Sequence, residues 1–188
     1  MIGWNESIKR ELGSCGESVF IGHNVVFTNP KNVHLGNNVR IDPFSVITTG
    51  LKTGDNVQIC THTVLGGGAS HTIELGDWIF IGYGSKLFCA SEDYSGDFGP
   101  VNEYWGSNRI FRGDIKFENY SGIASDVVVM PGVTVPEGCA VGAKSFVYTR
   151  NPLQPWSVYL GHPLKFFKTR NKENIITLSN TPSFLKSH

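Results

Sequence analysis

The sequence has no long run of one charge, no apolar stretch of membrane-spanning length and no closely spaced pair of cysteines. Its 16 basic and 16 acidic residues give a formal net charge of +0, so the basic surface needed to bind nucleic acid is absent. No apolar run approaches the roughly 20 residues of a membrane span, and residues 1–16 carry neither a signal peptide nor a lipidation motif. We therefore expect a cytoplasmic protein with no membrane span and no nucleic-acid partner.

The four cysteines are too far apart for the common metal and redox motifs. Without a CxxC pair, neither a zinc ribbon nor a thioredoxin-like site is expected, and we predict free, mostly buried thiols and no metal. A chain of 188 residues is long enough to bury the core of one domain. The cysteines are Cys15, Cys60, Cys89 and Cys139.

Aliphatic residues recur every six positions, and this period is the strongest feature of the chain. The step is unbroken near the C-terminus, at Ile123, Val129, Val135, Val141 and Val147. Shorter stretches of the same pattern lie upstream, at Ile21 and Phe27; Leu35, Ile41 and Ile47; Ile59 and Leu65; and Leu75, Ile81 and Leu87. A period of six predicts an all-β prism with three flat faces, in which three hexads complete one coil. An ordinary β-sandwich would instead show alternation with a period of two.

Two interruptions divide the pattern. The step from Leu65 to Leu75 is ten residues, which predicts a bulge at one corner around residues 66–71. Residues 91–113 are polar and aromatic with no hexad pattern, and a long loop in a compact repeat protein is usually functional. We therefore divide the chain into an N-terminal cap (1–18), a β-helix with an external loop (19–150, loop about 91–113) and a C-terminal turn, short helix and tail (151–188).

Three segments carry a family resemblance: VMPGVTVPEGCAVGAKS at residues 129–145, GHPLK at 161–165 and SEDYSG at 91–96. The chain resembles the hexapeptide-repeat acyltransferases, and its loop resembles the branch that modifies polysaccharides. The resemblance implies a left-handed parallel β-helix, a homotrimer with active sites between subunits, and acetyl-coenzyme A as the co-substrate. Where the family usually has Asn in the second segment, this chain has His162.

The resemblance implies an acetyltransferase that acts on a hydroxyl group of a sugar, in the synthesis of lipopolysaccharide O-antigen or capsule. The alternative is N-acetylation of a nucleotide-linked amino sugar. Two further hypotheses share the prism: a non-catalytic scaffold, and a zinc protein of the γ-carbonic-anhydrase kind that would use His62 and His71.

Acyl transfer needs a general base and a donor that stabilises the oxyanion. The family's usual histidine would fall near Ser91 and Glu92, so its catalytic residue cannot be carried over. His71, beside the glycine triplet of the expected bulge, is our first candidate for the base. His62, Asp93 and Glu92 are the other candidates, the two acids either as the base or as a partner that orients a histidine.

Binding residues are expected on the late coils and in the external loop. The resemblance implies that the pantetheine arm of coenzyme A lies along Ala124, Gly142, Ala143 and Ser145. The basic residues Lys144, Arg150, Lys165 and Arg170 are candidates for its phosphates. The aromatic residues Tyr94, Tyr104 and Trp105 are candidates for stacking on a sugar or a nucleobase.

Overall fold

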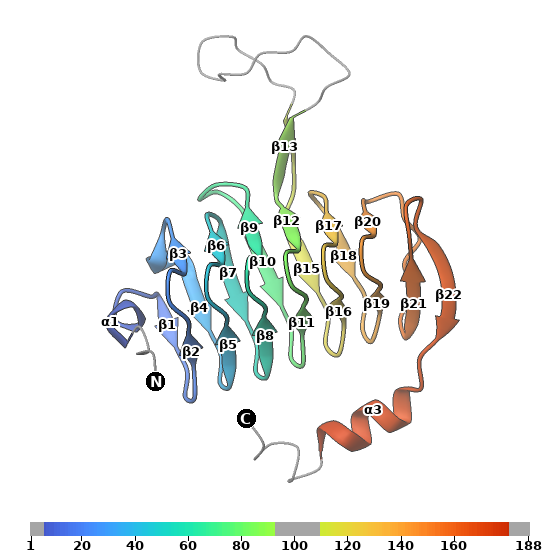
Figure 1. Ribbon diagram of the computed structural model, residues 1–188, viewed down its shortest axis with the longest axis horizontal. Coiled ribbons are helices and arrows are strands. Elements are labelled where there is room, and N and C mark those ends of the chain that lie inside the picture. The colour runs from blue at the N-terminus through green and yellow to red at the C-terminus, as the bar shows by residue number, and fades with distance from the viewer. Residues whose placement is uncertain (1–5, 93–109, 181–188) are drawn as a thin grey trace.

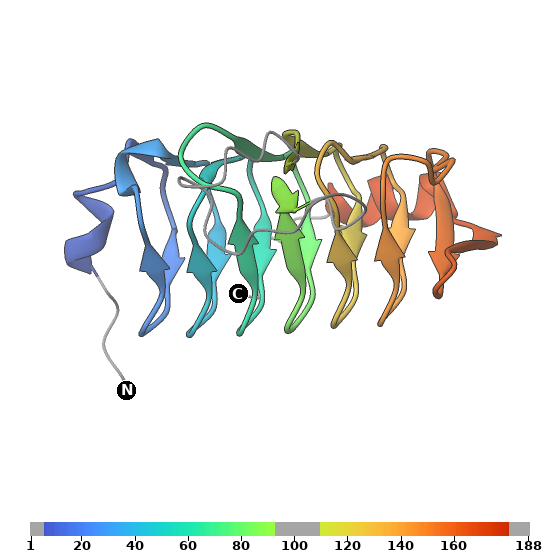
Figure 2. The same ribbon diagram turned by 90° about the horizontal axis from the view of Figure 1, so that it is seen from above.

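The computed structural model describes residues 6–92 and 110–180. Its short strands wind into six coils that stack along one axis and enclose a three-sided prism (Figure 1). The fold is the all-β, left-handed parallel β-helix expected from the six-residue period, with a short C-terminal helix. Seen from above, the coils are evenly spaced from one end of the molecule to the other (Figure 2). No helix of the described residues is long and apolar enough to cross a membrane.

Each coil gives one strand to each of three parallel sheets, which we name sheets A, B and C. Sheet A contains β1 (Ser14–Cys15), β4 (Val33–Leu35), β7 (Gly50–Thr53), β10 (Thr72–Leu75), β15 (Ile115–Phe117) and β18 (Thr134–Val135). Sheet B contains β2 (Phe20–Ile21), β5 (Val39–Ile41), β8 (Val57–Ile59), β11 (Phe80–Ile81), β16 (Gly122–Ile123), β19 (Ala140–Val141), β21 (Ser157–Leu160) and β22 (Lys165–Thr169). Sheet C contains β3 (Val26–Phe27), β6 (Val46–Ile47), β9 (Val64–Gly66), β12 (Lys86–Phe88), β17 (Val128–Val129) and β20 (Phe146–Val147).

The six-residue period marks the side chains that fill the prism. All the residues that define it are buried except the aromatic Phe27, which packs partly buried against the core. In the parallel register, each lies directly against its counterpart in the next coil, as Ile41 does against Ile59. A second inward position lies two residues earlier, and it too is buried, as at Val39, Val57 and Ile79. Each hexad therefore presents two side chains to the core, one in the strand and one at or just before its start, which explains how strands of two or three residues hold together.

The corner between sheets A and B carries a ladder of side chains that locks consecutive coils in register. The side-chain oxygen of Asn37 accepts a hydrogen bond from the backbone N–H of Glu17 at 2.9 Å. Asp55 does the same for Asn37 at 2.7 Å, and Asp77 for Asp55 at 2.8 Å. The ladder continues where Asn119 accepts from Asp77 at 2.9 Å. Because each rung joins two coils, the ladder satisfies backbone donors that the turns leave unpaired.

The three corners differ in how much variation they tolerate. The A/B and B/C corners are tight turns, each with one residue at positive φ, such as Asn56 (φ 59) and Asp126 (φ 58). The C/A corner, where one coil passes to the next, contains both interruptions. There the chain bulges between β9 and β10, as the ten-residue step predicted, and β13 (Ala90–Glu92) and β14 (Ile110–Arg112) form an antiparallel arm that leaves the prism (Figure 1).

The ends of the prism differ from the boundaries expected from the sequence. The first strand begins at Ser14, inside the segment predicted as a cap, and α1 (Glu6–Lys9) precedes it. At the other end, the basic stretch Lys165–Thr169 is not part of a turn or helix, because it pairs as β22 antiparallel to β21 at the edge of sheet B. The predicted short helix follows it as α3 (Lys172–Ser179), and a 3-10 turn, η1 (Pro30–Asn32), lies between the first two coils.

The ladder makes a prediction about stability. Replacing Asp77 with Ala removes the acceptor for the Asp55 N–H, and we expect the free energy of unfolding to fall by about 1–2 kcal/mol. Asp77→Asn keeps an acceptor oxygen and should lose less. Chemical denaturation of both variants checks this, with Lys52→Ala on the exposed face of sheet A as the control. An alanine variant as stable as the wild type would contradict it.

Candidate active site

The bulge at the C/A corner depends on two glycines. Gly67 (φ 144) and Gly68 (φ 77) adopt backbone conformations that other residues rarely reach. At Gly67 there is also no space, because a Cβ would lie 2.5 Å from the Cβ of Cys89 on the next coil. The glycines thus let the chain swing outward from β9 and return to the prism at His71, just before β10.

His71 meets a carboxylate where it rejoins the prism. Its Nδ1 lies 3.2 Å from Oδ1 of Asp114, and the backbone N–H of Thr72 donates to the same oxygen at 3.0 Å. The carbonyl of His71 accepts from the Gly50 N–H and the Thr49 hydroxyl, so the backbone is held as well. The imidazole is 19% exposed and Asp114 is 66% exposed. A carboxylate that accepts from Nδ1–H leaves Nε2 able to accept a proton, which is the arrangement of a general base.

A cavity of about 520 Å³ lies at the C/A corner, where the arm leaves the prism, and Ser70, the residue before His71, is part of its lining. In the arm, Ala90 pairs with Arg112 and Glu92 pairs with Ile110. The cavity therefore combines an acid, a guanidinium, two hydroxyls and three apolar side chains. Its lining consists of Gly67, Ser70, Phe88, Ala90, Ser91, Glu92, Ile110 and Arg112.

The structure separates the candidates for the base. His71 and Glu92 lie at the C/A corner, one in the bulge and the other in the arm. His62 lies at the B/C corner at φ 60, exposed, with its ring stacked on Phe44 at 5.3 Å and 12°. Asp93, Tyr94, Tyr104 and Trp105 fall outside the described residues. Asp114 was missed from the sequence, because nothing in the repeat indicates which residue will follow the returning arm.

Some of the residues predicted to bind coenzyme A have structural roles. Ser145 is buried, and its hydroxyl accepts from the Gly161 N–H at 2.8 Å. Gly142 faces Leu160 so closely that a Cβ would lie 2.0 Å from Cδ2 of that side chain. Arg170 donates to the carbonyls of Tyr120 and Gly138, and burial lowers the pKa of its guanidinium. By contrast, Ala143, Lys144, Arg150 and Lys165 are exposed, and Ala124 is half-buried.

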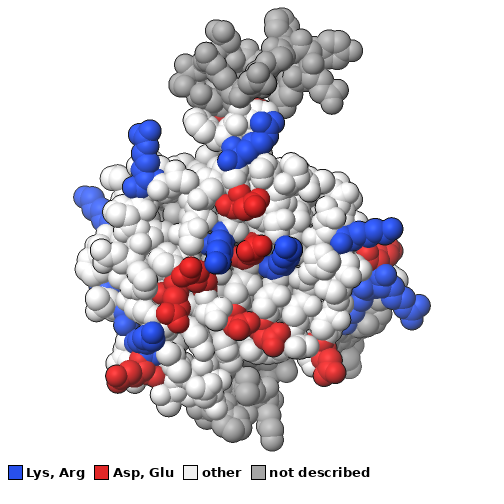
Figure 3. Space-filling model, turned by 180° about the vertical axis from the view of Figure 1, so that it is seen from behind, with Lys and Arg blue, Asp and Glu red and all other residues white. Residues whose placement is uncertain are grey.

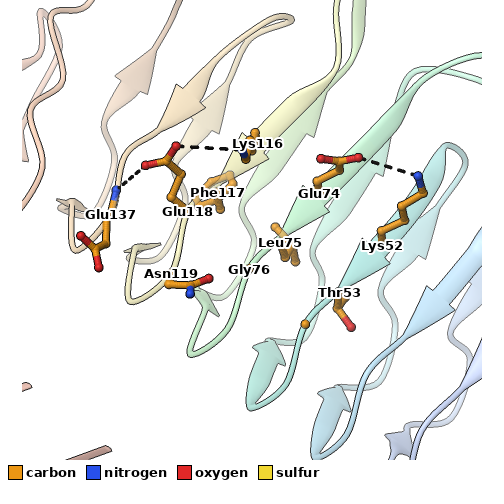
Figure 4. Close-up of a pocket in the computed structure, with 11 residues that line it drawn as sticks. Lys52, Thr53, Glu74, Leu75, Gly76, Lys116, Phe117, Glu118, Asn119 and Glu137 are labelled. Carbon is orange, nitrogen blue, oxygen red and sulfur yellow. Dashed lines mark hydrogen bonds and ion pairs between the residues drawn. The ribbon is translucent and has the colours of Figure 1, made fainter. Parts of the chain in front are cut away.

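A second cavity, of about 630 Å³, lies on the outer face of sheet A. Lysines and acids interleave there: Glu74 lies between Lys52 and Lys116 in the register, Lys52 and Glu74 are 3.8 Å apart, and Lys116 and Glu118 are 4.0 Å apart (Figure 4). The view from behind shows this mixture of charges across the face (Figure 3). No site residue predicted from the sequence lines this cavity, and its charges are already paired, so the C/A corner is the candidate active site.

Residues 6–92 and 110–180 contain no group of three or more His, Cys, Asp or Glu side chains that could hold a metal ion. His62 and His71, the pair considered for zinc, lie at different corners of the prism. Within this part of the chain, the zinc hypothesis has no ligand set.

Comparison with known proteins identifies the family. The chain is 31% identical over 173 residues to a dTDP-4-amino-4,6-dideoxy-D-glucose acyltransferase of Escherichia coli, covering 87% of this chain and 86% of that enzyme. It belongs to the hexapeptide-repeat acyltransferases. No protein-family model matches the sequence.

Two solved structures place the acyltransferase within this fold. AntD, an N-acyltransferase from Bacillus cereus in complex with dTDP and 3-hydroxybutyryl-CoA, is 30% identical and superposes with a TM-score of 0.85 over 100% of this chain and 98% of AntD. A galactoside acetyltransferase in complex with coenzyme A is 20% identical, with a TM-score of 0.57 over 89% of this chain and 70% of that one, and shares the fold alone.

The cysteines of the acyltransferase give a prediction that bears on any assay of thiol release. Burial raises the pKa of Cys60 and Cys89 to about 11 and that of Cys139 to about 12, whereas Cys15 is only half-buried. Because the thiolate is the reactive form, these three thiols should not react with a disulfide reagent at pH 8. We expect at most one cysteine per native chain to react quickly with the reagent, and all four to react after unfolding, followed by the absorbance of the released chromophore. Two or more fast thiols in the native protein would contradict this.

Proposed function

We propose that the acyltransferase moves an acyl group from acyl-coenzyme A to the amino group of a dTDP-linked amino sugar. The observation that carries this proposal is the match along nearly the whole chain to AntD, whose structures include one with dTDP-4-amino-4,6-dideoxyglucose and coenzyme A. The relative from Escherichia coli is named for an acceptor of the same kind. These relatives favour N-acylation, the alternative in the sequence analysis, over acetylation of a hydroxyl group.

We propose His71 as the general base, supported by its contact with Asp114. An amino group is protonated near neutral pH and must lose a proton before it attacks a thioester. The attack forms a C–N bond and breaks the C–S bond, so the proton taken by the base can pass to the departing thiolate. Asp114 is held by the Thr72 N–H as well as by His71, and this second contact fixes the carboxylate that orients the ring.

The acyl donor is proposed to lie along the late coils. Ala124, Ala143, Lys144, Arg150 and Lys165 remain proposed contacts for coenzyme A, while Gly142, Ser145 and Arg170 support the backbone around them. The use of the acylated sugar in a surface polysaccharide, which the family resemblance implies, is part of the same proposal.

A trimer is supported by the contrast between the outer faces. Sheet A presents charged residues, whereas the outward column of sheet C is apolar except for Lys86: Val26, Val46, Val64, Val128 and Phe146. Val26 is 50% exposed, and so is Phe44 at the neighbouring B/C corner. Exposed apolar patches of this kind mark contact surfaces, and we propose that a second copy covers this one.

The proposed activity is tested by following thiol release and product mass. We expect acyl transfer to dTDP-4-amino-4,6-dideoxyglucose from acetyl-CoA or 3-hydroxybutyryl-CoA, and none to a dTDP-linked deoxy sugar that has only hydroxyl groups. His71→Gln should lower kcat by about 100-fold or more, which is the usual contribution of a general base to the rate. Acylation of the hydroxyl sugar at an equal rate would instead support O-acetylation.

His23→Gln is the matched control for that experiment, because His23 lies in an early B/C turn away from the bulge. It should retain the wild-type kcat. Full activity in the His71 variant, with loss in His62→Gln, would move the base to the B/C corner.

The trimer is tested by molar mass in solution. Light scattering after gel filtration should give three chains for the wild type, and Val64→Lys, which buries a charge in the proposed contact, should shift the mass to one chain. Far-UV circular dichroism confirms that the variant remains folded. A monomeric wild type, or a trimeric Val64→Lys variant, would contradict the proposal.

A further inference from the structure

Two opposite charges face the cavity at the foot of the arm without pairing to each other. Glu92 lies on β13 and Arg112 on β14, and both line the cavity. Because Glu92 pairs with Ile110 and Arg112 with Ala90, the two occupy diagonal positions of the ribbon. Diagonal neighbours in a sheet are within reach of long side chains. Among residues 6–92 and 110–180, however, neither forms an ion pair, in contrast to the lysines and acids of sheet A.

A cavity with a separate acid and guanidinium is complementary to a ligand with a separate cation and anion. A neutral sugar would give neither charged side chain an oppositely charged partner. A phosphate compound without an amine would give Arg112 a partner but leave Glu92 without one. Arg favours phosphate oxygens because its planar fork can donate two parallel hydrogen bonds. The apolar side chains of Phe88 and Ile110 on the same wall suit the methyl group of a 6-deoxy sugar.

We infer that this cavity binds the acceptor as a zwitterion, with Glu92 receiving the ammonium group of the amino sugar and Arg112 receiving the diphosphate. The inference rests on the proposed function and assigns its acceptor subsite. The position is consistent with the proposed base, because the lining residue Ser70 directly precedes His71 and Arg112 lies two residues before Asp114. The amine would thus be held in its ammonium form at the same C/A corner as the proposed base.

The two roles predict different effects of two substitutions on dTDP binding and on KM for the free amino sugar. Arg112→Gln should weaken the binding of dTDP, measured by titration calorimetry, and raise KM for the dTDP-linked amino sugar, each by about ten-fold or more, since a charge-assisted contact to phosphate is lost. Its KM for the free amino sugar, without the nucleotide, should stay within about two-fold of the wild-type value. Glu92→Gln should leave dTDP binding unchanged and raise KM for both amino sugars by about ten-fold.

Lys52→Gln, on the outer face of sheet A, is the control and should behave as wild type in every measurement. Equal loss of dTDP affinity in the Glu92 and Arg112 variants, or no loss in the Arg112 variant, would overturn the inference. Calorimetry separates this failure from that of the proposed function, because it needs no turnover. The wild type could acylate no amino sugar while dTDP binding still depends on Arg112 and not on Glu92. That result would support the role of Arg112 in binding the diphosphate and would contradict the proposed reaction.

Discussion

Each coil of the prism must return to the register of the coil before it, because the backbone bonds between coils are the only ones that the short strands can make. Strands of two or three residues have no stability of their own, so the register depends on what fills the inside and what locks the corners. The stacked aliphatic side chains fill the interior, and the hydrogen-bonded ladder from Asn37 to Asn119 fixes the A/B corner. The position of His71 against Asp114 follows from this constraint, since the two residues belong to consecutive coils and meet only when the coils are aligned.

The left-handed path of the chain requires unfavourable backbone conformations at the corners. Parallel strands are usually joined by right-handed crossovers with a helix between them, whereas here the crossings are single turns with no helix. Residues at these turns take positive φ, including bulky ones such as Phe44, Trp78 and Tyr120, at roughly 1–2 kcal/mol each. Burial of two side chains per hexad offsets this. The C/A corner is free of the strict turn geometry, and it is the corner that accommodates a bulge and an arm.

The period of six predicted the coils, the buried aliphatic columns and both interruptions, because those depend on spacing alone. The pairing of His71 with Asp114 was beyond the sequence, since they are 43 positions apart and the contact depends on how many residues the arm takes up. Arg170 illustrates the opposite case. It was predicted to bind phosphate because it is basic. In the structure its guanidinium donates hydrogen bonds to two backbone carbonyls at a corner of the last coils, a role that only the placement of the C-terminal strand reveals. The opposed charges of Glu92 and Arg112 likewise become visible only when the arm is folded.

The antiparallel strand β22 has a consequence for the C-terminal edge of sheet B. A stack of parallel coils ends in open strand edges, and such an edge is a template on which another chain can grow. The edge of sheet B is closed by β22, which runs against the direction of the other strands and carries Lys165 and Lys168 on either side of the exposed Phe166 and Phe167. An approaching parallel strand would meet the wrong polarity and two positive charges. The strand β22 therefore hinders the addition of a further parallel strand at this edge of sheet B.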